Sequence, residues 1–371
     1  MDVLTLTKKL LSFNTVNPPG NEEDIARFTG NIFSEHEFRV EYLPYGKNRL
    51  QLVAEKGITE LSRPIVLTGH FDTVPTGSNP WKKDPFSGEI CDGKIWGRGA
   101  SDMKGALASM IIAAIEAAAG KTLKNGIRII FTADEEPGCR GAEEYVRSIR
   151  NHQKAGAIIV GEPTANLPAT AHKGAIYLKA ECTGKTAHSS MPEKGVNAIY
   201  KAARAIIRLS ELKLNSGSDL MPGQPTLNVG RITGGMNINS VPDHAEFTID
   251  IRTASGTDHR SIPDLITNTL GDDAVPEMLV DINPLYTPAE DPFVRLVYDI
   301  CGIDEKSQGF PLALPYLTDG AVLQRFYNNA PAVILGPGEP DMAHQTDEYC
   351  FIDKLEKSVI IYKEIISKWN Q

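Results

Sequence analysis

Four short apolar segments of the chain each lead into histidine or carboxylate side chains. A short apolar run of this kind predicts a buried strand. Helical patterns separate the segments, and strands that alternate with helices indicate an α/β fold, with a mainly parallel sheet sandwiched by helices. The segments and the side chains that follow them are Ile65–Leu67 with His70, Ile127–Phe131 with Glu135 and Glu136, Ile158–Val160 with Glu162, and Val333–Leu335 with His344.

The side chains beyond these segments are expected to meet at one edge of the sheet, because open parallel sheets bind ligands at the carboxyl ends of their strands. Asp102 joins them, since it lies between the glycines Gly97 and Gly99 and a long apolar helix that starts at Ala106. Several carboxylates in one place repel each other unless cations balance their charge. Two histidines and three or four carboxylates suit two divalent metal ions, with zinc first and cobalt or manganese as alternatives.

Each of these residues also has an ordinary explanation when it is taken alone. Asp102 could be a helix N-cap, Glu135 with Glu136 could form a solvated acidic turn, and His344 could lie on the surface. Their joint placement at the strand ends favours the metal site over these separate explanations.

His70 and Asp72 are separated by one residue directly after the first apolar segment. Residues i and i+2 of an extended chain face the same side, so both side chains can serve one site. One could bind a metal ion while the other fixes the imidazole tautomer from behind. A satisfied histidine beside a turn-forming aspartate is the alternative.

The composition is that of a globular protein and excludes some classes of binding partner. The formal net charge of −9 argues against nucleic acid or an anionic membrane as the main partner. The longest apolar stretch, Ala106–Ala119, contains Ser109 and Glu116 and is too short to span a bilayer. The five scattered cysteines lack CxxC spacing, which argues against them as a group of metal ligands. They indicate a reducing compartment, with the cytoplasm as the default location.

The pattern of elements changes in the middle of the chain. From about Lys173 to Pro288 the predicted order is strand, helix, two strands, helix and strand, which is a split β-α-β sandwich. We therefore predict a catalytic domain in two parts, residues 1–173 and 289–371, and an inserted α+β ferredoxin-like domain of residues 174–288. Hinges near its two ends would let the inserted domain act as a lid.

Five motifs occur in the same order as in a known family. GHFDTVP, GRGASDMKG, TADEE, GEPT and AHQTDEY resemble the M20 family of dinuclear metallohydrolases, and the likeness covers nearly the whole chain. Within that family, AHKG (171–174), AHSSMPEKGVNAI (187–199) and PTLNVG (225–230) look like the acetylornithine deacetylase branch. The resemblance implies a zinc-exopeptidase-like catalytic domain and a dimerisation role for the inserted domain.

The resemblance also implies a role for each side chain at the strand ends. Asp102 would bridge the two ions, and the peptide bond between Asp102 and Met103 would be cis. Asp72 would orient His70, and Glu135 would be the general base. The other ligands would be His70 and Glu162 for one ion, and Glu136 and His344 for the second ion.

In the inserted domain the resemblance implies three further residues. His188 would reach the site of the neighbouring subunit in a homodimer and hydrogen-bond the scissile carbonyl oxygen. Asn239 and Arg252 would bind substrate, Arg252 by gripping a carboxylate with its fork of donors. From the residues alone, His188 would be an exposed loop histidine and Arg252 a surface arginine. Asp319 occupies the position of the aspartate in a TDA-like motif of the family. In this chain Gly320 is inserted between that aspartate and the alanine, Ala321.

The implied reaction is metal-assisted hydrolysis of an amide in a small N-acyl amino acid, with N-acetylornithine as the leading substrate. Other members of the family suggest N-succinyl-diaminopimelate, other acyl amino acids and small dipeptides as alternatives. A protein of another class, a catalytically silent amino-acid sensor that binds metal, is also considered. The presence of Glu135 and His188 favours the enzyme.

Overall fold

The computed structural model describes residues 1–149, 154–214, 221–304 and 312–371. The chain divides into two compact units. Unit 1 comprises Met1–Ala171, Leu285–Ala313 and Thr318–Gln371, and unit 2 comprises His172–Pro284 and Leu314–Leu317. The domain limits predicted at 173/174 and 288/289 stay a prediction.

Unit 1 is built on a large sheet whose centre is parallel, as the sequence predicted. The strand order is β1-β2-β6-β3-β7-β17-β8-β15, with β16 paired to β8. The neighbours β6–β3, β3–β7 and β7–β17 run parallel, whereas β1–β2, β2–β6 and β17–β8 run antiparallel. The strands are β1 (Arg39–Gly46), β2 (Arg49–Lys56), β3 (Ile65–His70), β6 (Ile127–Thr132), β7 (Ala157–Val160), β8 (Ala169–His172), β15 (Leu285–Tyr286), β16 (Leu312–Leu314) and β17 (Ala332–Ile334).

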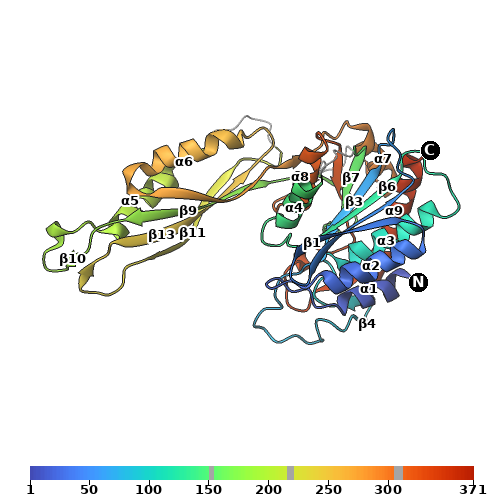
Figure 1. The fold of residues 1–371 in the computed structure, drawn as a ribbon, viewed down its shortest axis with the longest axis horizontal. Coiled ribbons are helices and arrows are strands. Elements are labelled where there is room, and N and C mark those ends of the chain that lie inside the picture. Colours follow the sequence, from blue (N-terminus) through green and yellow to red (C-terminus); the bar gives the residue numbers. More distant parts are fainter. Residues whose placement is uncertain (150–153, 215–220, 305–311) are drawn as a thin grey trace. The chain divides into compact units, whose positions relative to one another are not determined.

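Helices cover both faces of this sheet (Figure 1). The helices on one face share a continuous apolar core with the sheet, in which β3 and β6 are buried along their whole length. That face carries α1 (Val3–Leu11), α2 (Glu23–Glu35), α3 (Lys104–Ala118), α7 (Pro292–Cys301) and α9 (Ile352–Trp369). The opposite face carries α4 (Arg140–Ser148) and α8 (Asp319–Phe326). Strands buried from both sides need apolar residues at every position, which explains the continuous apolar runs in the sequence.

A small second sheet in unit 1 joins two distant parts of the chain. Its strand order is β18-β5-β4, with β4 (Glu89–Cys91), β5 (Lys94–Trp96) and β18 (Tyr349–Phe351). Tyr349 pairs with Trp96, so the residues just before β18 lie beside the loop that follows β5. Between β17 and β18 the chain forms a short 3₁₀ turn, η4 (Pro340–Met342).

Unit 2 has the β-α-β-β-α-β order predicted from the sequence. Its four-stranded sheet has the order β11-β13-β9-β14, and all neighbours are antiparallel. Two helices pack on one face of this sheet over their own apolar core (Figure 1). The elements are β9 (Gly174–Thr183), α5 (Ala198–Glu211), β11 (Thr226–Gly234), β13 (His244–Thr253), α6 (Ile262–Leu270) and β14 (Val275–Ile282). A two-stranded ribbon, β10 (Ala187–His188) with β12 (Ser240–Val241), and the 3₁₀ turns η1 (Pro192–Lys194), η2 (His259–Ser261) and η3 (Gly271–Asp273) complete the unit.

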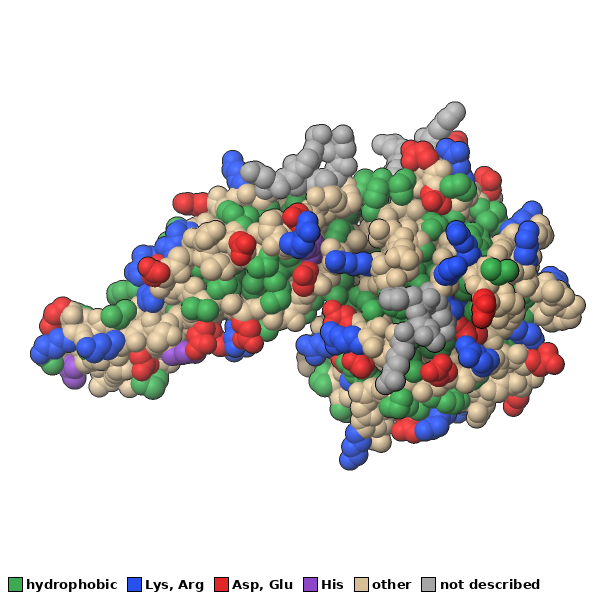
Figure 2. Space-filling model, turned by 45° about the horizontal axis from the view of Figure 1, so that its top comes forward, with side chains coloured by type: hydrophobic (Ala, Val, Ile, Leu, Met, Phe, Trp, Pro, Cys, Tyr) green, Lys and Arg blue, Asp and Glu red, His purple; other side chains and the backbone are tan. Residues whose placement is uncertain are grey.

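Acidic and basic side chains are interspersed on the face of the molecule shown in Figure 2. Within the described residues, every helix is too short or too polar to cross a lipid bilayer.

Candidate metal centre

The strand ends of unit 1 bring the five predicted metal ligands together in two groups. His70, Asp102 and Glu162 form the first group, and Asp102, Glu136 and His344 form the second. In each group one ligand atom per residue lies within 4.8 Å of the others. Because β3, β6, β7 and β17 share one central sheet, residues far apart in sequence reach the same edge of it.

The distances within the first group suit ligands of one ion. His70 Nε2 lies 3.2 Å from Asp102 Oδ1 and 3.6 Å from Glu162 Oε1. Ligands bound at about 2 Å with tetrahedral angles lie about 3.3 Å apart, close to the separations found here. All three side chains are buried.

The second group uses the other oxygen of the shared aspartate. His344 Nε2 lies 3.4 Å from Asp102 Oδ2 and 3.1 Å from Glu136 Oε2. His344 itself is exposed and has a left-handed backbone with φ of 65°. Because the two groups approach different oxygens of Asp102, this carboxylate has the geometry of a bridge between two ions.

The charges of the centre fit two cations. In the described part of the chain, no lysine or arginine forms an ion pair with Glu135, Glu136 or Glu162, although all three carboxylates are nearly inaccessible. Burial raises the pKa of each of these three acids, and the neighbouring carboxylates raise it further. Hydrogen bonds to Asp102 and Glu136 raise the pKa of His344 to about 10. Such a cluster favours added positive charge, which two divalent ions would supply.

Asp72 contacts His70 mainly through its main chain. The Nδ1 atom of His70 lies 2.8 Å from the carbonyl oxygen of Asp72 and 3.6 Å from its carboxylate. A hydrogen on Nδ1 that is donated to this carbonyl leaves Nε2 free to bind an ion. The Asp72 carboxylate instead accepts bonds from the backbone N–H groups of Glu135 (3.1 Å) and Glu136 (3.3 Å) and from Asn17 (2.9 Å). Asp72 therefore holds the turn that carries the two glutamates.

Glu348 holds the loop of Asp102 and was not singled out from the sequence. One of its oxygens accepts the backbone N–H groups of Ser101 (2.8 Å) and Asp102 (2.9 Å). The other accepts the Gly99 N–H (2.9 Å) and the Arg98 guanidinium (2.6 Å). Glu348 directly precedes β18, and β5 directly precedes the loop. The pairing of β18 with β5 therefore places Glu348 beside this loop. The peptide bond between Asp102 and Met103 is cis, as the family resemblance implies.

Glu135, the predicted base, lies close to Cys139 and Asp319, and one ligand atom of each residue is within 4.8 Å of the other two. The Cys139 thiol donates to Glu135 Oε1 at 3.4 Å. Asp319 begins α8 and accepts a hydrogen bond from the Thr132 hydroxyl, while burial raises the pKa of Asp319 to about 6. The following residue, Gly320, has no room for a side chain, because a Cβ atom there would lie 2.6 Å from Val160.

The three predicted substrate residues of unit 2 do not lie together. His188 and Asn239 are neighbours at the β10–β12 ribbon, where the Ser189 N–H donates to the Asn239 carbonyl. Arg252 pairs with Ala175 at the start of β9, whereas His188 lies beyond Thr183 at its end. The eight residue steps from Ala175 to Thr183 span on the order of 25 Å. A small substrate therefore cannot touch both His188 and Arg252 of one chain.

His188 and Arg252 each have local partners. His188 is exposed, and its Nδ1 atom accepts the Ser190 N–H at 3.1 Å, so the neutral ring carries its hydrogen on Nε2. Arg252 donates to both oxygens of Asp250, at 2.9 and 3.3 Å, and stacks over Tyr177. Their predicted roles toward substrate stay predictions.

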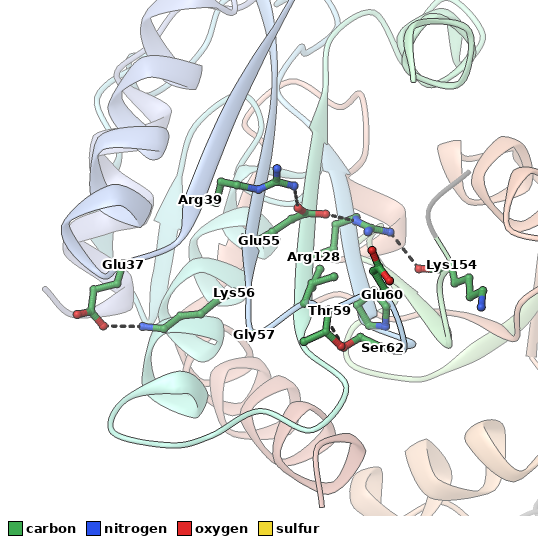
Figure 3. A pocket seen from close by; sticks show the side chains of 12 residues that line it. Glu37, Arg39, Glu55, Lys56, Gly57, Thr59, Glu60, Ser62, Arg128 and Lys154 are labelled. Atoms are coloured by element: carbon green, nitrogen blue, oxygen red, sulfur yellow. Dashed lines mark hydrogen bonds and ion pairs between the residues drawn. The ribbon is translucent and has the colours of Figure 1, made fainter. Parts of the chain in front are cut away.

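A cavity of about 630 Å³ lies at the opposite ends of the strands (Figure 3). Its wall includes Arg128 at the start of β6 and Glu55 near the end of β2, joined at 2.7 Å. Arg39 pairs with the same glutamate, so one carboxylate is shared by two guanidinium groups. Among the residues that the structure describes, neither metal-ligand group contributes to this wall.

The strand ends of a mostly parallel α/β sheet gather two histidine–carboxylate groups around a shared aspartate, an arrangement that suits a two-metal site. Residues 66–368 match the sequence profile of Peptidase family M20/M25/M40, and the chain belongs to this family. The family match identifies the class of protein as a metal-dependent hydrolase.

Similar proteins include enzymes with different substrates. Acetylornithine deacetylase of Vibrio vulnificus is 29% identical over 94% of this chain and 92% of its own length. Probable succinyl-diaminopimelate desuccinylase of Staphylococcus epidermidis is also 29% identical, over 99% of this chain and 98% of its own length. The crystal structure of a tripeptidase from Staphylococcus aureus matches with a TM-score of 0.78 at 22% identity, over 99% of this chain and 98% of that one.

Proposed function

We propose that this hydrolase removes the acyl group from N-acyl amino acids, with N-acetylornithine as its main substrate. The observation that supports the reaction most strongly is the pair of ligand groups that meet at the two oxygens of Asp102. The relatives named as a deacetylase and a desuccinylase support an acyl amino acid as the substrate. N-Succinyl-diaminopimelate and dipeptides are the alternatives within the same reaction.

Five residues would hold two divalent ions, with zinc preferred because imidazole and carboxylate ligands suit it. His70 and Glu162 would bind one ion, Glu136 and His344 the other, and Asp102 both. Bound ions of this kind lower the pKa of a coordinated water toward neutrality and polarise an amide carbonyl.

Glu135 would be the general base. Its backbone N–H is fixed by Asp72, and its carboxylate is buried beside both ligand groups. It would take a proton from the attacking water and then deliver that proton to the amine as the C–N bond breaks. The products would be the free amino acid and the carboxylic acid of the acyl group.

His188 would stabilise the negative charge that develops on the carbonyl oxygen. Its Nε2 carries the hydrogen in the neutral ring, since Nδ1 accepts the Ser190 N–H. A donor aimed at that oxygen is worth about 3 kcal/mol in the transition state. Arg252 would bind the carboxylate of the substrate with its fork of donors, and Asn239, beside His188, would assist.

The separation of His188 from Arg252 within unit 2 supports a homodimer. If Arg252 binds the substrate in one subunit, the His188 that contacts the same substrate belongs to the partner. Mixing two inactive variants, Glu135→Gln and His188→Ala, should therefore restore about a quarter of wild-type activity through mixed dimers. Activity that stays at the sum of the two variants would contradict this sharing.

Hydrolysis of a panel of substrates by the zinc- and cobalt-loaded protein tests the proposed substrate. The panel comprises N-acetylornithine, other N-acetyl amino acids, N-succinyl-diaminopimelate and dipeptides. We expect the highest kcat/KM for N-acetylornithine, and a higher value for N-succinyl-diaminopimelate or a dipeptide would assign that substrate instead. Tight binding of two ions without hydrolysis of any member would favour the amino-acid sensor.

A further inference from the structure

A third group of metal-ligating atoms lies beside the proposed base. Glu135, Cys139 and Asp319 each place one ligand atom within 4.8 Å of the other two. All three residues are buried, with 6%, 0% and 1% of their surface exposed. Neither of the two groups around Asp102 uses Cys139 or Asp319, so this is a separate set of donors.

Three different elements hold these donors in place. Glu135 follows β6, Cys139 directly precedes α4, and Asp319 is the first residue of α8. The Cys139 backbone N–H donates to the Glu135 carbonyl at 2.7 Å, which closes the turn between them. Donors fixed by packed elements lose little freedom when they bind an ion.

The separation of the sulfur and oxygen atoms suits a zinc ion. Cys139 Sγ lies 3.4 Å from Glu135 Oε1. Bond lengths of about 2.3 Å to sulfur and about 2.1 Å to oxygen at a tetrahedral angle place these atoms about 3.6 Å apart. The donors therefore need little movement to bind one ion.

An unsatisfied oxygen provides an independent indication of a ligand. Asp319 Oδ1 is buried and has no hydrogen-bond partner of good geometry among the described residues, while Oδ2 accepts the Thr132 hydroxyl. The Cys139 thiol also approaches Asp319, but its single hydrogen is donated to Glu135 Oε1. A buried polar atom without a partner costs free energy, and native structures rarely retain one without a reason. A cation bound between Asp319 and its two neighbours would satisfy this oxygen.

We propose that Glu135, Cys139 and Asp319 form a site for a third divalent ion that prefers sulfur, such as zinc, cobalt or cadmium, and that this ion inhibits hydrolysis. On binding, the metal–sulfur bond replaces the S–H bond and the proton leaves to solvent. The ion would occupy the Glu135 carboxylate, so the inhibition rests on the proposed role of Glu135 as base, whereas the site does not. Repulsion from two nearby cations makes this site the last to fill.

Cobalt titration of the metal-free full-length protein tests the site without relying on activity. A thiolate bound to Co²⁺ gives a charge-transfer band in the near ultraviolet, whereas imidazole and carboxylate ligands do not. We expect this band only after the first two equivalents have bound, together with the release of one proton. Cys139→Ser and Cys139→Ala should abolish the band, and Asp319→Asn should weaken binding of the third ion at least about tenfold. Cys91→Ser, which changes a half-exposed cysteine elsewhere, should leave the band unchanged.

Activity measured along the same titration tests the inhibition. Hydrolysis by the wild-type protein should fall as the band appears, whereas Cys139→Ala should keep the rate that it shows at two equivalents. Absence of the band, or its persistence in both Cys139 variants, would overturn the site. A band that appears without loss of activity would overturn the inhibition. Failure of every substrate would refute the proposed function while the spectrum still decides the site.

Discussion

Replacing Glu348 with glutamine should weaken both the fold of unit 1 and its metal binding. Each oxygen of Glu348 accepts two hydrogen bonds, from Arg98 with Gly99 and from Ser101 with Asp102. Glutamine keeps the shape but replaces one oxygen with an NH₂ group, which cannot accept. One pair of donors then loses its acceptor on residue 348, although Arg98 keeps its bonds to the carbonyl oxygens of Gln345 (3.2 Å) and Pro75 (3.1 Å).

The loss of unfolding free energy depends on which pair of donors loses its acceptor. If the amide faces Arg98 and Gly99, the charged bond contributes about 2 kcal/mol and the backbone bond about 1–2 kcal/mol. The sum of about 3–4 kcal/mol agrees with the cost of about 3–5 kcal/mol for breaking a buried ion pair. Because the loop carries Asp102, we also expect metal affinity to fall by about 10–100-fold.

Two measurements check this expectation. Urea unfolding of the metal-free protein gives the loss of unfolding free energy, and competition with a chelator gives the affinity for zinc. Glu356→Gln is the matched control, because Glu356 is exposed on α9 and its change should alter the unfolding free energy by less than about 0.5 kcal/mol. The reasoning is wrong if Glu348→Gln changes the unfolding free energy by less than about 1 kcal/mol and leaves zinc affinity within about threefold.

Three further predictions concern the base, the bridge and a buried histidine. Glu135→Gln should lower kcat at least about a hundredfold while elemental analysis finds nearly unchanged metal content, and near-normal turnover would refute the role of Glu135 as base. Asp102→Asn should instead lower metal occupancy, because both ions lose a charged ligand; full occupancy in the same analysis would argue against the bridge. Burial lowers the pKa of His172 to about 4 from 6.5, so between these pH values the unfolded chain binds a proton that the folded chain does not. His172 alone should therefore lower the unfolding free energy by about 3 kcal/mol between pH 7 and pH 4. In urea titrations, the change in unfolding free energy between these pH values should differ by that amount between His172→Asn and the wild-type protein, and an equal change in the two proteins would contradict the prediction.

The sequence was sufficient for the parts of the fold that depend on local pattern. Segments buried on both faces, such as β3 and β7, appear as continuous apolar runs. The antiparallel margins of the main sheet were not predicted, because short strands such as β8 and β15 carry little pattern of their own. Their pairing depends on contacts between distant segments.

The residues of the candidate site could be predicted only where a sequence motif of the family lies at the end of a predicted strand. The ligand groups around Asp102 follow from that coincidence, whereas the role of Glu348 depends on the pairing of β18 with β5, which no local pattern reveals. The prediction that Asp72 orients His70 stays a prediction; the Asp72 carbonyl oxygen, rather than its carboxylate, makes the shorter contact with the imidazole. The lack of CxxC spacing argues against the five cysteines as a group of ligands, whereas the neighbours of Cys139 in space are carboxylates.

Anomalous diffraction from crystals of the zinc-loaded protein tests the central claim most directly. We expect two peaks about 3.5–4 Å apart, one on each side of the Asp102 carboxylate. The first should contact His70 and Glu162, and the second Glu136 and His344. A single peak, or two peaks that do not share Asp102, would contradict the dinuclear centre.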